Sequence, residues 1–266
     1  MSGSALRVAM VAACGALGAC ELPTSTIPPA ESQLIVEAVL DANSVVQIIR
    51  VERSQPGFGT RTLHVTGAVV TITTPTSQTF TANDLVDPNF GAIGFYYVGV
   101  SAVLPMVAGW TYTLRVHTPA GEDVIGTTTM PRFTTANPPL DVFPIFDRAR
   151  DTLRLAWPAV ALAKRYEIVV RGAITGSNGS IVRSYSAFTD TSVTLAGDAR
   201  TLGNEPVFLD HTTTLVQVSA VDDNYYTYYH ANVDPFAGAP PSRLTGALGV
   251  FGAIAPVLKR EYLETR

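Results

Sequence analysis

The stretch Val45-Val46-Gln47-Ile48-Ile49-Arg50-Val51-Glu52-Arg53 decides the fold class of this chain. In an extended chain, successive side chains point to opposite faces. This stretch divides into two such faces: Val45, Gln47, Ile49 and Val51 opposite Val46, Ile48 and Arg50. A short alternating run rich in β-branched residues predicts a β-strand. The turn-forming triplet Gln55-Pro56-Gly57 follows it, so we expect the strand to end there.

Similar short runs surround this stretch. Residues 34–40, 45–53, 68–73, 78–81, 94–100, 111–117 and 124–129 are the predicted strands. Turn signals such as Pro75-Thr76-Ser77 and Pro119-Ala120-Gly121 separate them. Short strands at this spacing predict an antiparallel β-sandwich over residues 33–131. The composition agrees, because 47% hydrophobic and only 15% charged residues argue against disorder.

A second module is expected after a linker. The linker, residues 132–144, contains Asn137-Pro138-Pro139. Residues 145–266 then resemble a fibronectin type III-like sandwich. The resemblance rests on Trp157 in an early strand, Tyr166 in the next, and a late strand with Val216, Val218 and Ala220. The sequence departs from that family at Thr214, where a corner tyrosine is usual. The expected fold class is therefore all-β, with two antiparallel immunoglobulin- or fibronectin III-like β-sandwiches.

One short helix is expected near the C-terminus, at Asp222–Ala231. Asp222 or Asp223 is a good N-cap. Tyr225, Tyr228 and Tyr229 follow at helical spacing and form one stripe. After this helix we expect a closing strand at 248–255, with 257–263 as a further strand or tail.

The beginning of the chain predicts export. Met1–Arg7 is short and basic, and an apolar run from Val8 to Ala19 follows. This run is too short to span a bilayer, so it is typical of a secretory signal peptide over residues 1–19. Leu17-Gly18-Ala19-Cys20 resembles the lipobox of bacterial lipoproteins, which implies cleavage before Cys20 and lipidation of its thiol. The alternative is an ordinary cleaved signal with an incidental cysteine.

The lipidated form would carry its lipid on an extended tether. Residues 20–32 combine Pro23, Pro28 and Pro29 with Thr and Ser, a composition typical of a linker. Several acyl chains give stable anchoring in a membrane. Cleavage would leave Cys20 as the only cysteine, which excludes a structural disulfide and a cysteine zinc site.

Charge argues against nucleic-acid binding. The chain has 18 basic and 22 acidic residues, a net charge of −4. Removal of residues 1–19 deletes Arg7 and no acid, so 17 bases remain against 22 acids, or −5. The only lysines are Lys164 and Lys259. A clustered basic footprint, which nucleic-acid binding requires, is missing from the sequence.

No catalytic, metal or cofactor site is predicted. The string Gly99-Val100-Ser101-Ala102-Val103 lacks the final glycine of a nucleophile elbow. The histidines are widely separated, at His64, His117, His211 and His230, without metal-ligand spacing. Two acidic pairs, Asp222-Asp223 and Asp84/Asp87, could act as acid and base or bind calcium. We interpret the first as a helix cap and the second as turn residues.

The tyrosine cluster is the strongest candidate for an interface. It consists of Tyr225, Tyr226, Tyr228 and Tyr229. Aromatic rings with a polar tip suit sugar stacking or contact with a protein. The competing interpretation is packing in the core, which is the commoner fate of aromatic side chains. A short helix cannot direct all four rings to the core.

The chain as a whole resembles the outer-membrane lipoprotein family catalogued as domain of unknown function 4249. The resemblance rests on the lipobox, on segments 34–37, 66–72, 109–114 and 222–229, and on Asp234-Pro235-Phe236 with residues 246–252. It implies a non-catalytic binding or accessory lipoprotein of the cell envelope, beside an outer-membrane transporter or another envelope protein. It implies no reaction, cofactor or site residue. The alternatives are a glycan-binding module and a hydrolase with a site assembled from loops.

The expected location is the outer membrane. Glu21 follows Cys20, where an Asp would retain a lipoprotein in the inner membrane. The sequence leaves open which side of the membrane the protein faces.

Overall fold

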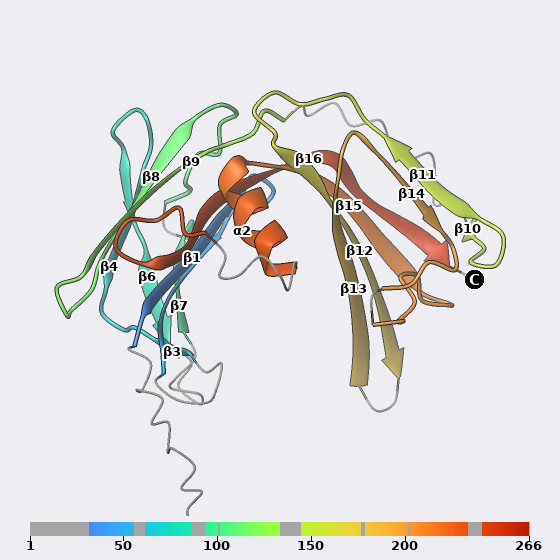
Figure 1. The fold of residues 1–266 in the computed structure, drawn as a ribbon, viewed down its shortest axis with the longest axis horizontal. Coiled ribbons are helices and arrows are strands. Elements are labelled where there is room, and N and C mark those ends of the chain that lie inside the picture. The colour runs from blue at the N-terminus through green and yellow to red at the C-terminus, as the bar shows by residue number, and fades with distance from the viewer. Residues whose placement is uncertain are drawn as a thin grey trace, which may run out of the picture. The chain divides into compact units, whose positions relative to one another are not determined.

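Residues of the β-sheets account for most of the chain that the structure describes (Figure 1). The computed structural model describes residues 32–55, 62–86, 94–100, 102–133, 145–176, 179–201, 203–233 and 241–265. All of them belong to one unit, Ser32–Arg266. The predicted signal peptide, Cys20, Asp87 and most of the predicted linker lie outside the described residues.

One large sheet joins the two halves of the chain. Its strands, in spatial order, are β13 (Gly179–Thr189), β12 (Arg165–Gly176), β15 (Thr213–Val221), β16 (Leu248–Thr265), β1 (Leu34–Asp41), β2 (Gln47–Ser54), β7 (Gly94–Val98) and β6 (Asn83–Val86). Two short strands pair at its sides, β10 (Ile145–Phe146) with β16 and β3 (Thr62–His64) with β2. The pairs are antiparallel except for β1 and β10, which lie parallel to β16.

Two smaller sheets complete the β-structure of the described residues. The first contains β5 (Thr79–Thr81), β4 (Val69–Thr73), β8 (Thr111–His117) and β9 (Asp123–Thr129). The second contains β11 (Thr152–Ala156) and β14 (Ser192–Ala196). The prediction of a mainly β-chain is therefore confirmed.

The predicted alternation agrees with the burial of side chains over Gln47–Val51 but not with that of Val45, which was assigned to the same face and is 62% exposed. Ile49 and Val51 of β2 are fully buried, whereas Ile48 is half exposed. The same pattern holds in β12, where Tyr166, Ile168 and Val170 are buried. These faces form two cores, because apolar side chains leave water only on the side covered by another sheet.

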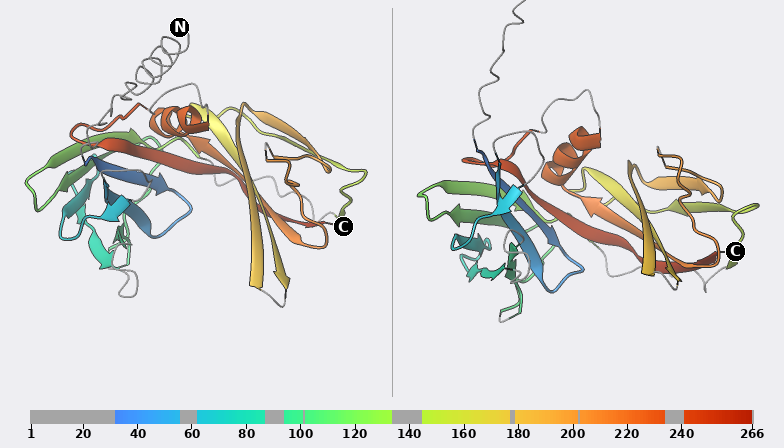
Figure 2. Two further views of the ribbon diagram at one scale, coloured as in Figure 1. Left: turned by 60° about the horizontal axis from the view of Figure 1, so that its bottom comes forward. Right: turned by 90° about the horizontal axis from the view of Figure 1, so that it is seen from below.

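The strand β16 contributes to both cores. Phe251, Ala253 and Ala255 pack in the core formed with β1, β2, β4, β8 and β9. Val257 and Leu258 pack in the other, with Trp157 and Tyr166. Residues 248–265 form this single strand, where a closing strand and a separate strand or tail were expected. Both predicted modules therefore share one sheet through β16, which Figure 2 shows passing from one side to the other.

The predicted helix is present as α2, Asp223–Val233. Its N-cap is Asp222, whose Oδ1 accepts a hydrogen bond of 2.9 Å from the backbone N–H of Tyr225. Figure 1 shows α2 lying against the sheet beside β16. Gly252 of β16 faces the first turn of the helix, next to Tyr225. The helix therefore covers the face of β16 opposite Phe251 and Ala253.

Candidate binding site

Polar side chains at the N-terminus of α2 fix this helix to the sheets. Asp222 is buried, and its two oxygens also accept hydrogen bonds from Thr128 Oγ1 at 2.6 Å and from the Ala253 N–H at 3.1 Å. The Asn224 amide donates to the carbonyls of Thr127 and Phe251, at 2.7 and 2.9 Å. These bonds join polar groups of β9, β16 and the first turn of α2. The helix is thereby held in one position.

Two tyrosine hydroxyls anchor the helix to strands on either side of it. The Tyr225 hydroxyl donates to Glu167 Oε2 of β12 at 2.9 Å. The Tyr228 hydroxyl donates to Glu37 Oε1 of β1 at 3.0 Å, and the Tyr228 side chain is buried. Since β15 and β16 lie between β12 and β1, this helix bridges the strands contributed by both halves of the chain.

The pKa values of Glu167, Tyr225 and Tyr229 are raised above their ordinary values. Burial raises the pKa of Glu167, although the hydrogen bond from Tyr225 and the nearby Arg171 oppose the rise. Burial and the negative charge of Glu167 also raise the pKa of Tyr225. For Tyr229, burial and Glu37 raise the pKa to about 12. Both phenols are therefore neutral hydrogen-bonding groups at physiological pH.

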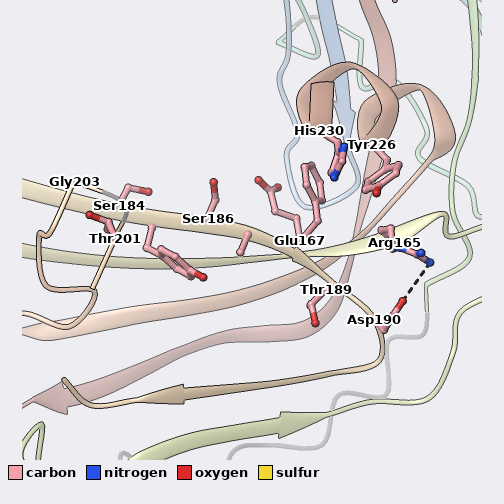
Figure 3. Close-up of a pocket in the computed structure, with 13 residues that line it drawn as sticks. Arg165, Glu167, Ser184, Ser186, Thr189, Asp190, Thr201, Gly203, Tyr226 and His230 are labelled. Carbon is pink, nitrogen blue, oxygen red and sulfur yellow. Dashed lines mark ion pairs between the residues drawn. The ribbon is translucent and has the colours of Figure 1, made fainter. Parts of the chain in front are cut away.

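A cleft of about 630 Å³ lies between the helix and the edge of the large sheet. Figure 3 shows Tyr226 and His230 extending from the helix above the strand that carries Glu167. Thr201 and Gly203 stand at the far end. The full lining is Arg165, Glu167, Ser184, Tyr185, Ser186, Ala187, Phe188, Thr189, Asp190, Thr201, Gly203, Tyr226 and His230.

Aromatic rings and an ion pair form the end of this cleft nearest the helix. The Phe188 ring lies 5.1 Å from that of Tyr226, nearly perpendicular to it, and the Tyr226 ring lies 4.9 Å from His230. Arg165 Cζ lies 5.9 Å from the centre of the Tyr226 ring. Its Nη1 pairs with Asp190 Oδ1 at 3.2 Å. This end can contact both an apolar group and a charged one.

A second, smaller cleft of about 310 Å³ lies on the other side of the helix. Tyr229 contributes to its lining, together with Glu37, Val39, Asp41, Ser44, Val46, Gln47, Ile48 and Arg50. Arg50 Nη1 lies 3.9 Å from Glu37 Oε2. The two clefts therefore flank one helix on one face of the sheet.

The structure divides the four tyrosines predicted as an interface. Tyr225 and Tyr228 hold the helix on the sheet, whereas Tyr226 and Tyr229 each line a cleft. Sequence reasoning missed Phe188, which completes the aromatic end of the larger cleft. A signal for it was present in β13, because alternation along the strand places Ser184, Ser186 and Phe188 on the same face.

The other candidate groups are placed apart. His64 Nε2 lies 2.7 Å from Asp84 Oδ1, and His117 Nδ1 lies 2.8 Å from Asp123 Oδ1. Within the described ranges, no three His, Cys, Asp or Glu side chains are grouped as a metal site would need. Asp222 caps the helix as predicted.

Among the described helices, none has the length and apolar character needed to cross a membrane.

Comparisons with known proteins identify one family. The model of the family described as "Domain of unknown function (DUF4249)" matches residues 21–260. Among curated proteins, none matches the sequence significantly. Similar solved structures include the pullulanase from Anoxybacillus sp. LM18-11 with maltotriose and without it, at 12% and 10% identity and a TM-score of 0.22. Each comparison covers 69% of this chain and 24% of the pullulanase, so this chain spans about a quarter of that protein. At this TM-score the likeness carries no inference.

Proposed function

Because the chain belongs to the family described as domain of unknown function 4249, we propose that it is a non-catalytic binding lipoprotein of the cell envelope. In this proposal lipid on Cys20 anchors it to the outer membrane. The clefts beside α2 bind a partner, either an outer-membrane transporter or another envelope protein. The protein acts as an accessory subunit of that partner.

The observation that carries the proposal is the position of Tyr226 and Tyr229. Each is half-buried and lines a cleft, while the neighbouring Tyr225 and Tyr228 hold the helix. Partly exposed aromatic side chains in a rigid setting are typical of residues that dominate binding energy. The helix is rigid because Asp222 and Asn224 fix its first turn.

We further infer that the second half of the chain is a fibronectin type III-like sandwich. The two-stranded sheet of β11 and β14 and the stretch β13-β12-β15-β16 of the large sheet are the two layers of such a fold. Trp157 supports this inference, because it is buried against Tyr166 with ring centres 5.4 Å apart. In this arrangement α2 lies in the connection between β15 and β16.

The binding proposal is tested in the native host by crosslinking. We expect Tyr226→Ala and Tyr229→Ala to reduce crosslinking of the lipoprotein to its partner at least fivefold. The melting temperature should change little, because neither hydroxyl anchors the helix. Tyr97→Ala is the matched control, since Tyr97 is also half-buried but lines neither cleft. Unchanged crosslinking in both variants would refute the proposal.

The anchor is tested separately. Cys20→Ala should move the protein from the membrane fraction to the soluble one, and mass spectrometry of the native protein should find acyl chains on its first residue. An unmodified amino terminus would show that the membrane anchor is wrong, without bearing on the clefts.

A glycan is the second candidate ligand for the larger cleft. The rings of Phe188 and Tyr226 and the Arg165–Asp190 pair would supply the stacking surface and the hydrogen bonds that sugars require. A glycan array screened with the lipoprotein tests this alternative. Binding that is lost in Tyr226→Ala would favour it.

A further inference from the structure

The larger cleft follows the edge of a strand. Seven consecutive residues of the lining, Ser184 to Asp190, belong to β13 or directly follow it. Successive side chains of a strand point to opposite faces of the sheet. A cleft on one face would therefore be lined by every second residue. A cleft lined by all of them runs along the edge.

That edge is free within the described part of the chain. The strand β13 is the last of the large sheet, and among the described residues it pairs with β12 alone. The pairing is unbroken from Tyr166↔Thr189 to Gly176↔Gly179. Natural proteins protect long edges with proline, bulges or short strands, because an unpaired edge accepts another strand. The 11 residues of β13 contain neither proline nor a register shift.

The walls of the cleft leave room for a chain beside this edge. Thr201 and Gly203 line one end, and Tyr226 and His230 of α2 line the other. Figure 3 shows these groups separated along the strand. An extended chain in this space could bond to the outward N–H and C=O groups of β13, since their spacing repeats that of a backbone. This is the geometry of recognition by an added strand.

The aromatic end of the cleft indicates which side chain the added strand presents near the helix. The charged groups at this end already have partners, because Arg165 pairs with Asp190 and lies over the Tyr226 ring, and Glu167 accepts the hydrogen bond from the Tyr225 hydroxyl. The rings of Phe188 and Tyr226 are only partly buried and line the cleft. Such rings offer a large contact area to an apolar side chain.

We propose that an extended segment of a partner protein pairs with β13 as an additional strand and places an apolar side chain against the rings of Phe188 and Tyr226. The inference rests on the proposed binding function and specifies how the larger cleft performs it. The smaller cleft beside Tyr229 is not required.

The test uses a displayed library of random 12-residue peptides, selected on the full-length lipoprotein in detergent. We expect enriched peptides to lack proline in their centre and to carry a large apolar residue at one fixed position. Replacing that residue by alanine should weaken binding at least tenfold. In Phe188→Ala, the same replacement should weaken binding less than threefold, because the ring that it contacts is gone.

Two proline variants test the backbone pairing. Neighbouring residues of β13 alternate between N–H groups that face β12 and N–H groups that face the cleft. One of Ser186→Pro and Ala187→Pro therefore removes an outward donor and keeps the fold, while the other breaks the pairing with β12 and is destabilised. The variant that folds normally should bind the selected peptide at least tenfold more weakly.

Four outcomes would overturn strand addition. The first is a library without an enriched peptide, and the second is enrichment without an apolar residue at a fixed position. The third is undiminished binding of the selected peptide to the well-folded proline variant. The fourth is a glycan or a second copy of this chain as the occupant of the cleft. If Tyr226→Ala or Tyr229→Ala still reduces partner crosslinking at least fivefold, the proposed binding function survives any of these outcomes. If crosslinking is unchanged in both variants, both proposals fail together.

Discussion

Gly252 lies so close to Tyr225 that a Cβ at position 252 would be 3.0 Å from the Tyr225 Cβ and 3.2 Å from its Cα and backbone nitrogen. Two of these three atoms belong to the backbone of α2, which cannot rotate away as a long side chain can. The absence of a side chain at position 252 therefore sets how closely the helix approaches β16. That approach also brings the Tyr225 hydroxyl to Glu167.

We expect Gly252→Ala to destabilise the protein by about 1–3 kcal/mol, the usual range for overpacking a close contact. The helix would have to move away from the sheet, and its bonds to Glu167 and Ala253 would lengthen. Urea unfolding measures the effect. Gly203→Ala is the control, because its added Cβ would make only an ordinary contact with Thr201 at 3.7 Å. Equal stability of both variants would contradict this account of the helix position.

Asp222 and Asp223 should differ sharply when each is replaced by alanine. Asp222→Ala removes the cap and leaves donors of Thr128, Tyr225 and Ala253 without an acceptor, so we expect a loss of roughly 2–4 kcal/mol. Asp223 forms exposed ion pairs with Lys164 and Arg243, which are worth less than about 1 kcal/mol. Chemical unfolding of the two variants tests this contrast. Similar losses of unfolding free energy in the two variants would contradict the role of Asp222 as the buried cap of α2.

Glu167 should make stability depend on pH. Burial raises its pKa above the ordinary value of 4.5, so the folded protein holds this proton more tightly than the unfolded chain does. Below the ordinary pKa, Glu167 makes its full contribution to the free energy of unfolding. This contribution is lost as the pH rises through the raised pKa of the folded protein. Glu167→Gln stays neutral and can still accept the bond from Tyr225. The unfolding free energy of this variant relative to the natural protein should therefore rise as the pH increases above the ordinary pKa of 4.5. A difference that stays constant with pH would contradict the prediction.

Gly94 and His64 should be energetically coupled. A Cβ at position 94 would lie 2.5 Å from Cδ2 of His64, whose side chain is almost completely buried beside Asp84. We expect Gly94→Ala to displace the imidazole and to cost about 1–3 kcal/mol. In a His64→Ala background the same change should cost less, since the ring is gone. A double-mutant cycle measures this coupling, and additive losses would argue against it.

The sequence predicted the local structure better than the way in which it assembles. Alternation at Gln47–Val51 identified a strand and its two faces, and Asp222 identified the start of α2. Local patterns report which face of a strand is apolar, but not which strand becomes its neighbour. The parallel pairing of β1 with β16 therefore had no visible signal. The closing strand was expected to end at residue 255, yet β16 continues past Pro256, where its register with β15 shifts.

The candidate site was predicted only in part for a similar reason. The tyrosines could be found because they are adjacent in sequence. Their division into anchors and cleft residues depends on Glu37, Glu167 and Phe188, which lie on three different strands. Tertiary structure alone brings these residues to the helix. The identity of a ligand for the cleft stays a prediction.

The contribution of β16 to both cores also shapes how the protein must fold. The strand β1 begins at Leu34, but its parallel neighbour begins only at Leu248, so neither core can close while the intervening chain is still being synthesised. Such distant pairings slow folding, because the cost of closing long loops must be met before the contacts form. A nascent chain of this kind remains open for longer during synthesis, as the proposed export across a membrane before folding would require.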